Sequence, residues 1–275
     1  MPTPVYRNFS QAELDARYDN RAAVPHHQAI QAGRTERSVA LYARVQCDRD
    51  VPYGNGARQR LDFFHCGKPK RPTLAYIHGG YWQWNDKEPS AFIAEGLLAR
   101  DVNVALVEYT LAPAATMDAI VTEIQSCTRW LLARLTTQFR AAGKLIVSGH
   151  SAGGHLTAIA LEVPGVHAGI AISGLFDLEP IRLSYLNAAI HLSPEDARRN
   201  SPVHRTPGTA PCVVTVGGAE LSELVRQSTE YAAFLRGNQR DVRELVLPGD
   251  DHFSILDHMA LPDGVLANAA VELFG

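Results

Sequence analysis

Between residues 73 and 247, six short apolar segments alternate with longer stretches of helical periodicity, and this alternation constrains the fold more than any other feature. The apolar segments are residues 73–77, 102–107, 144–148, 169–173, 212–216 and 242–247. Helix faces appear between them as apolar residues at steps of three and four, most clearly over residues 120–135, with others over 156–163 and 221–235. Apolar strands joined by amphipathic helices form parallel sheets with both faces covered. We therefore predict an α/β fold with a mostly parallel central sheet and helices on both faces.

The same pattern indicates where a functional site would lie. Crossover connections between parallel strands are right-handed, so the carboxyl ends of the strands share one edge of the sheet. Loops that follow the strands converge at that edge, where open α/β sheets bind their ligands. A chain of 275 residues can bury a large core, and we expect one domain over residues 1–275.

Two parts of the chain depart from the alternation. Near the N-terminus, Ser10-Gln-Ala-Glu13 is a capping box that predicts the start of a helix. For this part we expect a helix over residues 10–19, an irregular arm over 21–37 and strands over 38–46 and 60–65. Residues 176–211 contain five prolines and interrupt the later alternation. They are either a small cap inserted over the active edge or a decorated crossover.

The composition excludes several classes of protein. Hydrophobic residues make up 46% of the chain and charged residues 20%, which is typical of a globular enzyme and wrong for a disordered chain. The net charge of −3, with no basic run, argues against a nucleic-acid or membrane-surface partner. No segment reaches the ~18 apolar residues of a membrane span, and the first ten residues lack a signal-peptide core. Four widely spaced cysteines predict free thiols in a reducing compartment, so we expect a cytoplasmic protein.

The strongest chemical signal is the pentapeptide Gly149-His-Ser-Ala-Gly153 between an expected strand and an expected helix. A serine on such a sharp turn needs glycine two residues to either side, because a Cβ there would meet the adjacent backbone. The turn would lift the hydroxyl of Ser151 above the sheet edge as a nucleophile. The amide of Ala152, at the start of the helix, would point toward the same place.

A second glycine-rich loop, His78-Gly-Gly-Tyr-Trp82, follows an earlier strand. Acyl transfer places negative charge on the carbonyl oxygen, and preorganised amide donors stabilise that charge. We predict that the N–H groups of Gly80 and Tyr81 form an oxyanion hole together with that of Ala152. For His78 we expect a structural hydrogen bond that holds the loop.

A nucleophilic serine requires a base, and the base requires an orienting carboxylate. His252 lies in a turn-rich loop directly after the last strand, so we predict that it is the base. Glu220 follows the fifth strand and is our predicted acid, with Glu223 and Asp177 as the alternatives. For His258 we expect a surface or packing role, and for His155 a core contact.

No spacing of histidines, cysteines or carboxylates fits a metal site, and no Gly-x-Gly-x-x-Gly follows the first strand of the alternation. We therefore expect neither a metal nor a dinucleotide cofactor. Trp82 is assigned to the substrate pocket, with core packing as the alternative. The sequence does not choose among Arg21, Arg44 and Arg182 for the charged end of a substrate.

Several segments resemble the kynurenine formamidase (arylformamidase) family of α/β-hydrolases. They are Tyr18-Asp-Asn-Arg21, His78-Gly-Gly-Tyr-Trp-Gln83, Tyr109-Thr-Leu-Ala-Pro113, Gly149-His-Ser-Ala-Gly-Gly-His155 and Ser173-Gly-Leu-Phe-Asp-Leu-Glu-Pro180. The similarity extends from about residue 18 to about residue 256, nearly the whole chain, and the His-Gly-Gly-x-Trp motif is its most specific part.

The resemblance implies the α/β-hydrolase fold and hydrolysis of N-formyl-L-kynurenine to L-kynurenine and formate, with no metal or organic cofactor. It implies Ser151 as nucleophile, His252 as base and Glu220 as acid; members of the family commonly have aspartate at the last position. Two other activities remain open, an amidohydrolase of open-chain N-acyl products of heteroaromatic ring cleavage and a carboxylesterase of broad specificity. A non-catalytic binding protein on the same fold is a third alternative. The expected partner is a small amide or ester, and a homodimer is left open.

Overall fold

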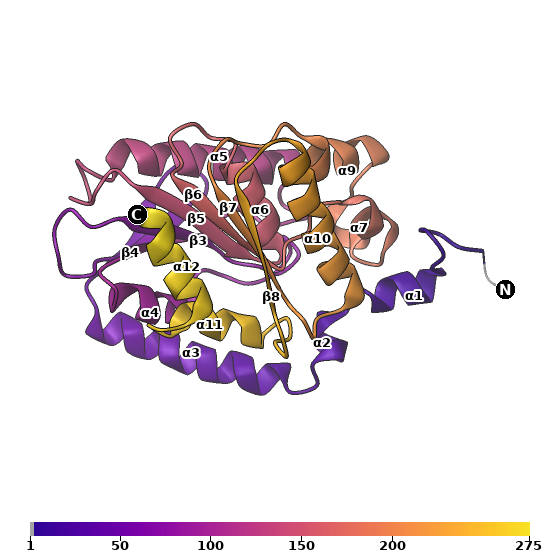
Figure 1. The fold of residues 1–275 in the computed structure, drawn as a ribbon, viewed down its shortest axis with the longest axis horizontal. Helices are drawn as coiled ribbons and strands as arrows, with labels where there is room; N and C mark the ends of the chain where they lie inside the picture. Colours follow the sequence, from indigo (N-terminus) through magenta and orange to yellow (C-terminus); the bar gives the residue numbers. More distant parts are fainter. Residues whose placement is uncertain (1–2) are drawn as a thin grey trace.

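The computed structural model of this protein describes residues 3–275 and is built around an eight-stranded sheet (Figure 1). The strands are β1 (Cys47–Pro52), β2 (Arg60–Phe64), β3 (Thr73–Ile77), β4 (Asn103–Val107), β5 (Leu145–His150), β6 (Ala168–Ile172), β7 (Cys212–Gly217) and β8 (Val242–Leu247). Their order across the sheet is β1-β2-β4-β3-β5-β6-β7-β8. β2 pairs antiparallel with both β1 and β4, and all other neighbours are parallel. The predicted, mostly parallel central sheet is confirmed.

Helices cover both faces of the sheet (Figure 1). Leu74 and Tyr76 of β3 pack on one face, and Ala75 and Ile77 pack on the other, as the alternation along a strand requires. The first face is covered by α3 (His27–Arg44), the 3₁₀ segment η1 (Glu88–Ile93), α4 (Ala94–Leu98), α11 (Asp257–Ala260) and α12 (Val265–Phe274). The second is covered by α5 (Met117–Arg134), α6 (Ala152–Ala160) and α10 (Ser222–Gly237).

The N-terminal predictions are correct in part. The capping box at Ser10 is present and begins α1 (Gln11–Ala16), which is followed by the short α2 (Asn20–Ala23). The irregular arm over 21–37 and the strand over 38–46 are wrong, because most of both segments forms the single helix α3. The inward face of α3 carries Arg34 and Ser38 beside Leu41, so polar residues at buried positions concealed its helical periodicity.

Residues 176–211 connect β6 to β7 and contain α7 (Glu179–Leu183), α8 (Asn187–Ile190), α9 (Pro194–Asn200) and the 3₁₀ turn η2 (Pro202–His204). α9 packs against both α5 and α7, and α7 also contacts α1 (Figure 1). This connection therefore brings the N-terminal segment and the loops after the strands into one neighbourhood.

Within residues 3–275, no helix is long and apolar enough to cross a membrane. In the same part of the chain no group of three or more histidine, cysteine, aspartate or glutamate side chains is arranged to hold a metal ion. All four cysteines are free thiols.

Candidate active site

Ser151 lies on the turn between β5 and α6, and its backbone is strained. Its φ of 58° and ψ of −118° lie in a region that non-glycine residues rarely occupy. The turn is crowded: a Cβ on Gly149 would lie 2.4 Å from the carbonyl oxygen of Gly153, and one on Gly153 would lie 2.0 Å from that of Ile77. The predicted need for glycine on both sides of the serine is therefore a direct consequence of the packing.

His252 and Glu220, 32 residues apart in sequence, form a hydrogen-bonded pair. Nδ1 of His252 lies 2.6 Å from Oε2 of Glu220, whose side chain is fully buried. A carboxylate on Nδ1 leaves Nε2 as the free ring nitrogen, which is the tautomer a general base requires. Ser151 and His252 line the same cavity. The hydroxyl of Ser151 has no hydrogen-bond partner among residues 3–275; contacts between a nucleophile and its base commonly tighten only when substrate is bound.

Other buried groups hold Glu220 in place. Its Oε1 accepts hydrogen bonds from the hydroxyl of Ser173 at 2.5 Å and from the backbone N–H of Gly217 at 2.8 Å. The two alternative acids are engaged elsewhere. Glu223 binds Arg226, and Asp177 accepts from the hydroxyl of Tyr6. Of the three carboxylates considered from sequence, the structure brings only Glu220 to His252.

Three other histidines are either neutral or engaged in structural hydrogen bonds. The ring of His150 lies 4.3 Å from that of His252, and burial, together with the charge of His252, holds the pKa of His150 well below its ordinary value. His150 is therefore neutral at physiological pH and adds no charge beside His252. His155 is buried with Nε2 2.8 Å from the carbonyl oxygen of Asn200, and His258 binds Asp250 on the surface side.

The glycine loop after β3 lies against the serine turn. A Cβ on Gly79 would lie 2.7 Å from the carbonyl oxygen of His150 and 3.1 Å from the Cβ of Ser151. The backbone N–H groups of Gly80, Tyr81 and Ala152 have no acceptor among residues 3–275. Gly80 and Tyr81 both have positive φ, so the backbone here has neither helix nor strand geometry. Free amide donors next to a serine turn have the character of an oxyanion hole.

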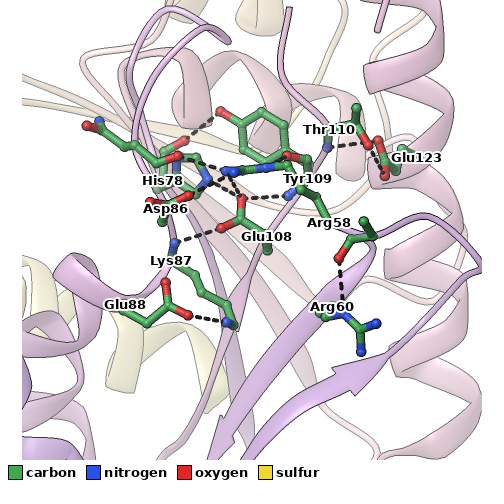
Figure 2. Close-up of polar contacts among 12 residues, drawn as sticks. Arg58, Arg60, His78, Asp86, Lys87, Glu88, Glu108, Tyr109, Thr110 and Glu123 are labelled. Carbon is green, nitrogen blue, oxygen red and sulfur yellow. Dashed lines mark hydrogen bonds and ion pairs between the residues drawn. The ribbon is translucent and has the colours of Figure 1, made fainter. Parts of the chain in front are cut away.

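A buried ionic network holds this loop (Figure 2). Nε2 of His78 lies 2.9 Å from Oε1 of Glu108, which also accepts from Arg58 at 2.7 Å and from the backbone N–H of Tyr109 at 3.0 Å. Oε2 of Glu108 accepts from the backbone N–H of Lys87. Burial acts to raise the pKa of Glu108, but the hydrogen bond and charge of His78 and the charge of Arg58 outweigh it, so the pKa lies below its ordinary value. Glu108 is thus an ionised anchor, and His78 has the structural role expected from sequence.

The cavity above these groups has a volume of about 820 Å³. Cavities of that size bury a ligand of drug-like dimensions. Trp82, assigned to the pocket from sequence, does not line it: the side chain is fully buried and packs edge-on against His155 at 5.1 Å. The aromatic residues at the opening are Trp84 and Tyr185, which are 37% and 45% exposed.

Of the three arginines considered for the charged end of a substrate, one lines the cavity. Arg21 lines the cavity, whereas Arg44 binds Glu95 and Arg182 binds Glu179. Sequence reasoning missed other polar residues of the cavity wall, Asp19, Asn20 and Arg34. The only signal in the sequence was that the first two belong to the segment Tyr18-Asp-Asn-Arg21 on which the family resemblance depends; nothing local marked Arg34.

Known proteins resemble this chain in sequence and in fold. The family model BD-FAE matches residues 61–165. The kynurenine formamidase of Danio rerio is 30% identical over 301 residues, which cover 98% of this chain and 98% of that protein. That of Salmo salar is 30% identical over 286 residues, covering 98% of this chain and 95% of that protein. The solved structure of a hyperthermophilic esterase from Pyrobaculum calidifontis superimposes with a TM-score of 0.72 at 17% identity and covers 98% of each chain, a likeness that shows the fold alone. The predicted α/β-hydrolase fold is confirmed.

Proposed function

This chain belongs to the kynurenine formamidase family of α/β-hydrolases and is an enzyme that acts on amide or ester bonds of small molecules; we propose that it hydrolyses N-formyl-L-kynurenine to L-kynurenine and formate with Ser151 as nucleophile. One observation carries the proposal: His252, held by the buried Glu220, lines the same cavity as Ser151 on its strained turn. A serine, a histidine with its carboxylate and nearby free amides are the parts that acyl transfer requires.

The mechanism follows from these positions. His252 takes the proton of Ser151 as its Oγ attacks the formyl carbonyl, and Glu220 stabilises the imidazolium that results. The amides of Gly80, Tyr81 and Ala152 donate to the oxyanion of the tetrahedral intermediate. His252 then gives its proton to the aryl nitrogen, the C–N bond breaks and the arylamine leaves. Water, deprotonated by His252, then attacks the formyl-enzyme. The bond between the formyl carbon and Oγ breaks, His252 returns the proton to Oγ of Ser151, and formate leaves.

The segment over residues 176–211 has a place in this proposal. Tyr185, between α7 and α8, lines the cavity and is partly exposed, which supports a cap role for this segment within a single domain. The four free thiols fit the reducing cytoplasm.

Substrate profiling tests the proposal. The measurement is kcat/KM for N-formyl-L-kynurenine beside 4-nitrophenyl acetate and an acyclic N-acyl enamine. We expect a sharp optimum for the formamide. A flat profile across the three would favour an esterase of broad specificity, and an optimum for the enamine would favour an amidohydrolase of ring-cleavage products. Failure of a fluorophosphonate probe to label the protein would contradict serine catalysis altogether.

A further inference from the structure

The opening of the cavity carries polar groups that the proposed chemistry does not use. Asp19, Asn20 and Arg21 come from the segment around α2, and all three line the cavity that contains Ser151. They lie far from the triad in sequence and belong to no strand of the sheet. Their charges and hydrogen-bonding capacity are therefore available to whatever enters the cavity.

Arg21 is a cation without an acidic partner. No carboxylate lies within salt-bridge distance of its guanidinium among residues 3–275, whereas Arg58, on the same side of the molecule, binds both Asp86 and Glu108. The guanidinium of Arg21 instead lies 4.8 Å from the ring centre of Trp84. A planar cation held over an aromatic face keeps its donors free for a carboxylate, the group that guanidinium binds best.

Asn20 contributes a buried hydrogen-bond acceptor to which no donor of residues 3–275 is bound. Its amide Nδ2 donates to the hydroxyl of Tyr81 at 3.0 Å, and that hydroxyl donates its single hydrogen to the carbonyl oxygen of Tyr18 at 2.7 Å. The hydroxyl can therefore only accept from Asn20, which determines that the amide nitrogen faces Tyr81. Among residues 3–275 the buried Oδ1 has no hydrogen-bond partner, and Asn20 as a whole is only 5% exposed. An unpaired buried acceptor lowers the stability of the folded protein, and a hydrogen-bond donor on a ligand would remove that penalty.

Asp19 adds a negative charge beside this acceptor. Its Oδ1 accepts from the backbone N–H of Ala22 at 3.0 Å as the cap of α2, and no lysine or arginine within residues 3–275 binds it. The segment thus presents an acceptor and a carboxylate next to an unpaired guanidinium. An ammonium and a carboxylate on one carbon atom would satisfy all three groups.

The chain of hydrogen bonds also sets where these groups lie relative to the reacting centre. The Asn20–Tyr81 contact ties α2 to the loop that holds the free amides of Gly80 and Tyr81. The aromatic rings of Trp84 and Tyr185 line the same cavity. A substrate whose scissile group is joined through an aromatic ring to a charged end would span the cavity.

We propose that Asn20 and Arg21, with the charge of Asp19, form a subsite for the zwitterionic α-amino-acid end of an aromatic amide, and that this subsite selects the substrate. The proposal rests on the proposed amide hydrolysis at Ser151 and adds the feature that a substrate must carry. Arg21 binds the carboxylate, and Oδ1 of Asn20 accepts a hydrogen bond from the ammonium.

The test pairs each side chain with the substrate group that it binds. The substrates are N-formyl-L-kynurenine, its decarboxylated analogue and its desamino analogue. For Arg21→Ala we expect kcat/KM on the full substrate to fall about tenfold, through KM, which is the ordinary cost of one charge-assisted contact. The same variant should hydrolyse the decarboxylated analogue within about twofold of the unmodified protein. Asn20→Ala also removes the hydrogen bond to Tyr81, so some loss is expected on all three substrates, but that loss should be about tenfold larger for substrates with the ammonium than for the desamino analogue.

The matched control is Arg134→Ala, which removes an arginine 4.7 Å from the ring centre of Trp130, on α5 and outside the cavity. Arg134→Ala should leave all three substrates unchanged. The proposal is wrong if Arg21→Ala loses as much on the decarboxylated analogue as on the full substrate. If the protein hydrolyses no formamide, the proposed function is wrong but the subsite can still be tested. Two aryl acetates that differ only in a carboxylate would then measure the preference of the subsite for that group. Equal effects of Arg21→Ala on those two esters would overturn the subsite.

Discussion

The cavity has a floor and a rim that differ in how the chain builds them. The floor consists of Ser151 and His252, and Glu220 contacts His252 from outside the cavity. These three residues follow the carboxyl ends of β5, β8 and β7, and their side chains are almost entirely buried. The rim includes Arg21 and Tyr185, which come from segments outside the sheet and are exposed. Groups on the sheet edge are positioned by many backbone hydrogen bonds, whereas rim groups are positioned by a few side-chain contacts. The difference predicts that floor variants lose the reaction, and rim variants lose only the choice of substrate.

The largest effect is expected from the floor. Ser151→Ala should lower kcat on the order of 10⁶, because only binding and the amide donors would remain. Ser90, which lines the same cavity on η1, supplies the matched control, and Ser90→Ala should keep normal turnover. Steady-state kinetics on the formamide gives both values. Near-normal turnover by Ser151→Ala would remove the nucleophile from this assignment.

The next effect concerns the partner of the base. Glu220→Gln should lower kcat about 10⁴-fold, since an amide cannot stabilise the imidazolium and can hold His252 in the wrong tautomer. Glu223→Gln is the control, because Glu223 is also buried, on the following helix, but binds Arg226 instead. Similar losses for the two variants would show that general destabilisation, not contact with the base, is being measured.

The floor should also depend on the network beneath the glycine loop. Glu108→Gln removes the charge that holds His78, and we expect kcat to fall about 10²-fold with little change in KM, as for the loss of one oxyanion donor. Glu123 is a suitable comparison: it accepts from Thr110 in the same region but does not touch His78 (Figure 2). If Glu123→Gln and Glu108→Gln slow the reaction equally, the network does not act through His78.

The smallest expected effect concerns stability and pH. Burial lowers the pKa of His155 to about 4, against 6.5 for an ordinary histidine. The unfolded chain takes up this proton first, so stability is lost as the pH falls from about 6.5 toward about 4. Between about pH 7.5 and about pH 5 the loss should be about 2 kcal/mol, and His155→Gln should abolish that part of it.

Urea unfolding of both proteins at the two pH values measures the difference, with His258→Gln on the surface as control. An unchanged pH dependence in His155→Gln would show that His155 carries a proton in the folded state. By contrast, α2 at the rim contains no buried histidine. The pH dependence of unfolding should therefore be the same in Arg21→Ala as in the unmodified protein.

Most of the sheet was predictable because its signals are local. All six apolar segments became strands, and residues 60–65 contain β2. β3 to β7 are buried along their whole length, as continuous apolar runs require, whereas β8 at the edge of the sheet is only partly buried. α3 was missed because two of its three most buried residues, Arg34 and Ser38, are polar and find their partners in distant parts of the chain. Arg34 donates to the carbonyl oxygen of Phe253, and Ser38 to that of Pro89.

The sequence alone determined the alternation of strands and helices over residues 73–247 and the sharp turn at Ser151, because glycine spacing and apolar periodicity act over a few residues. Only the tertiary structure decided which carboxylate meets His252, that Trp82 packs in the core, and that Arg21 lines the cavity with no carboxylate of residues 3–275 bound to it. Those outcomes depend on distances between segments far apart along the chain, and such distances are set by how the completed sheet and its helices pack together.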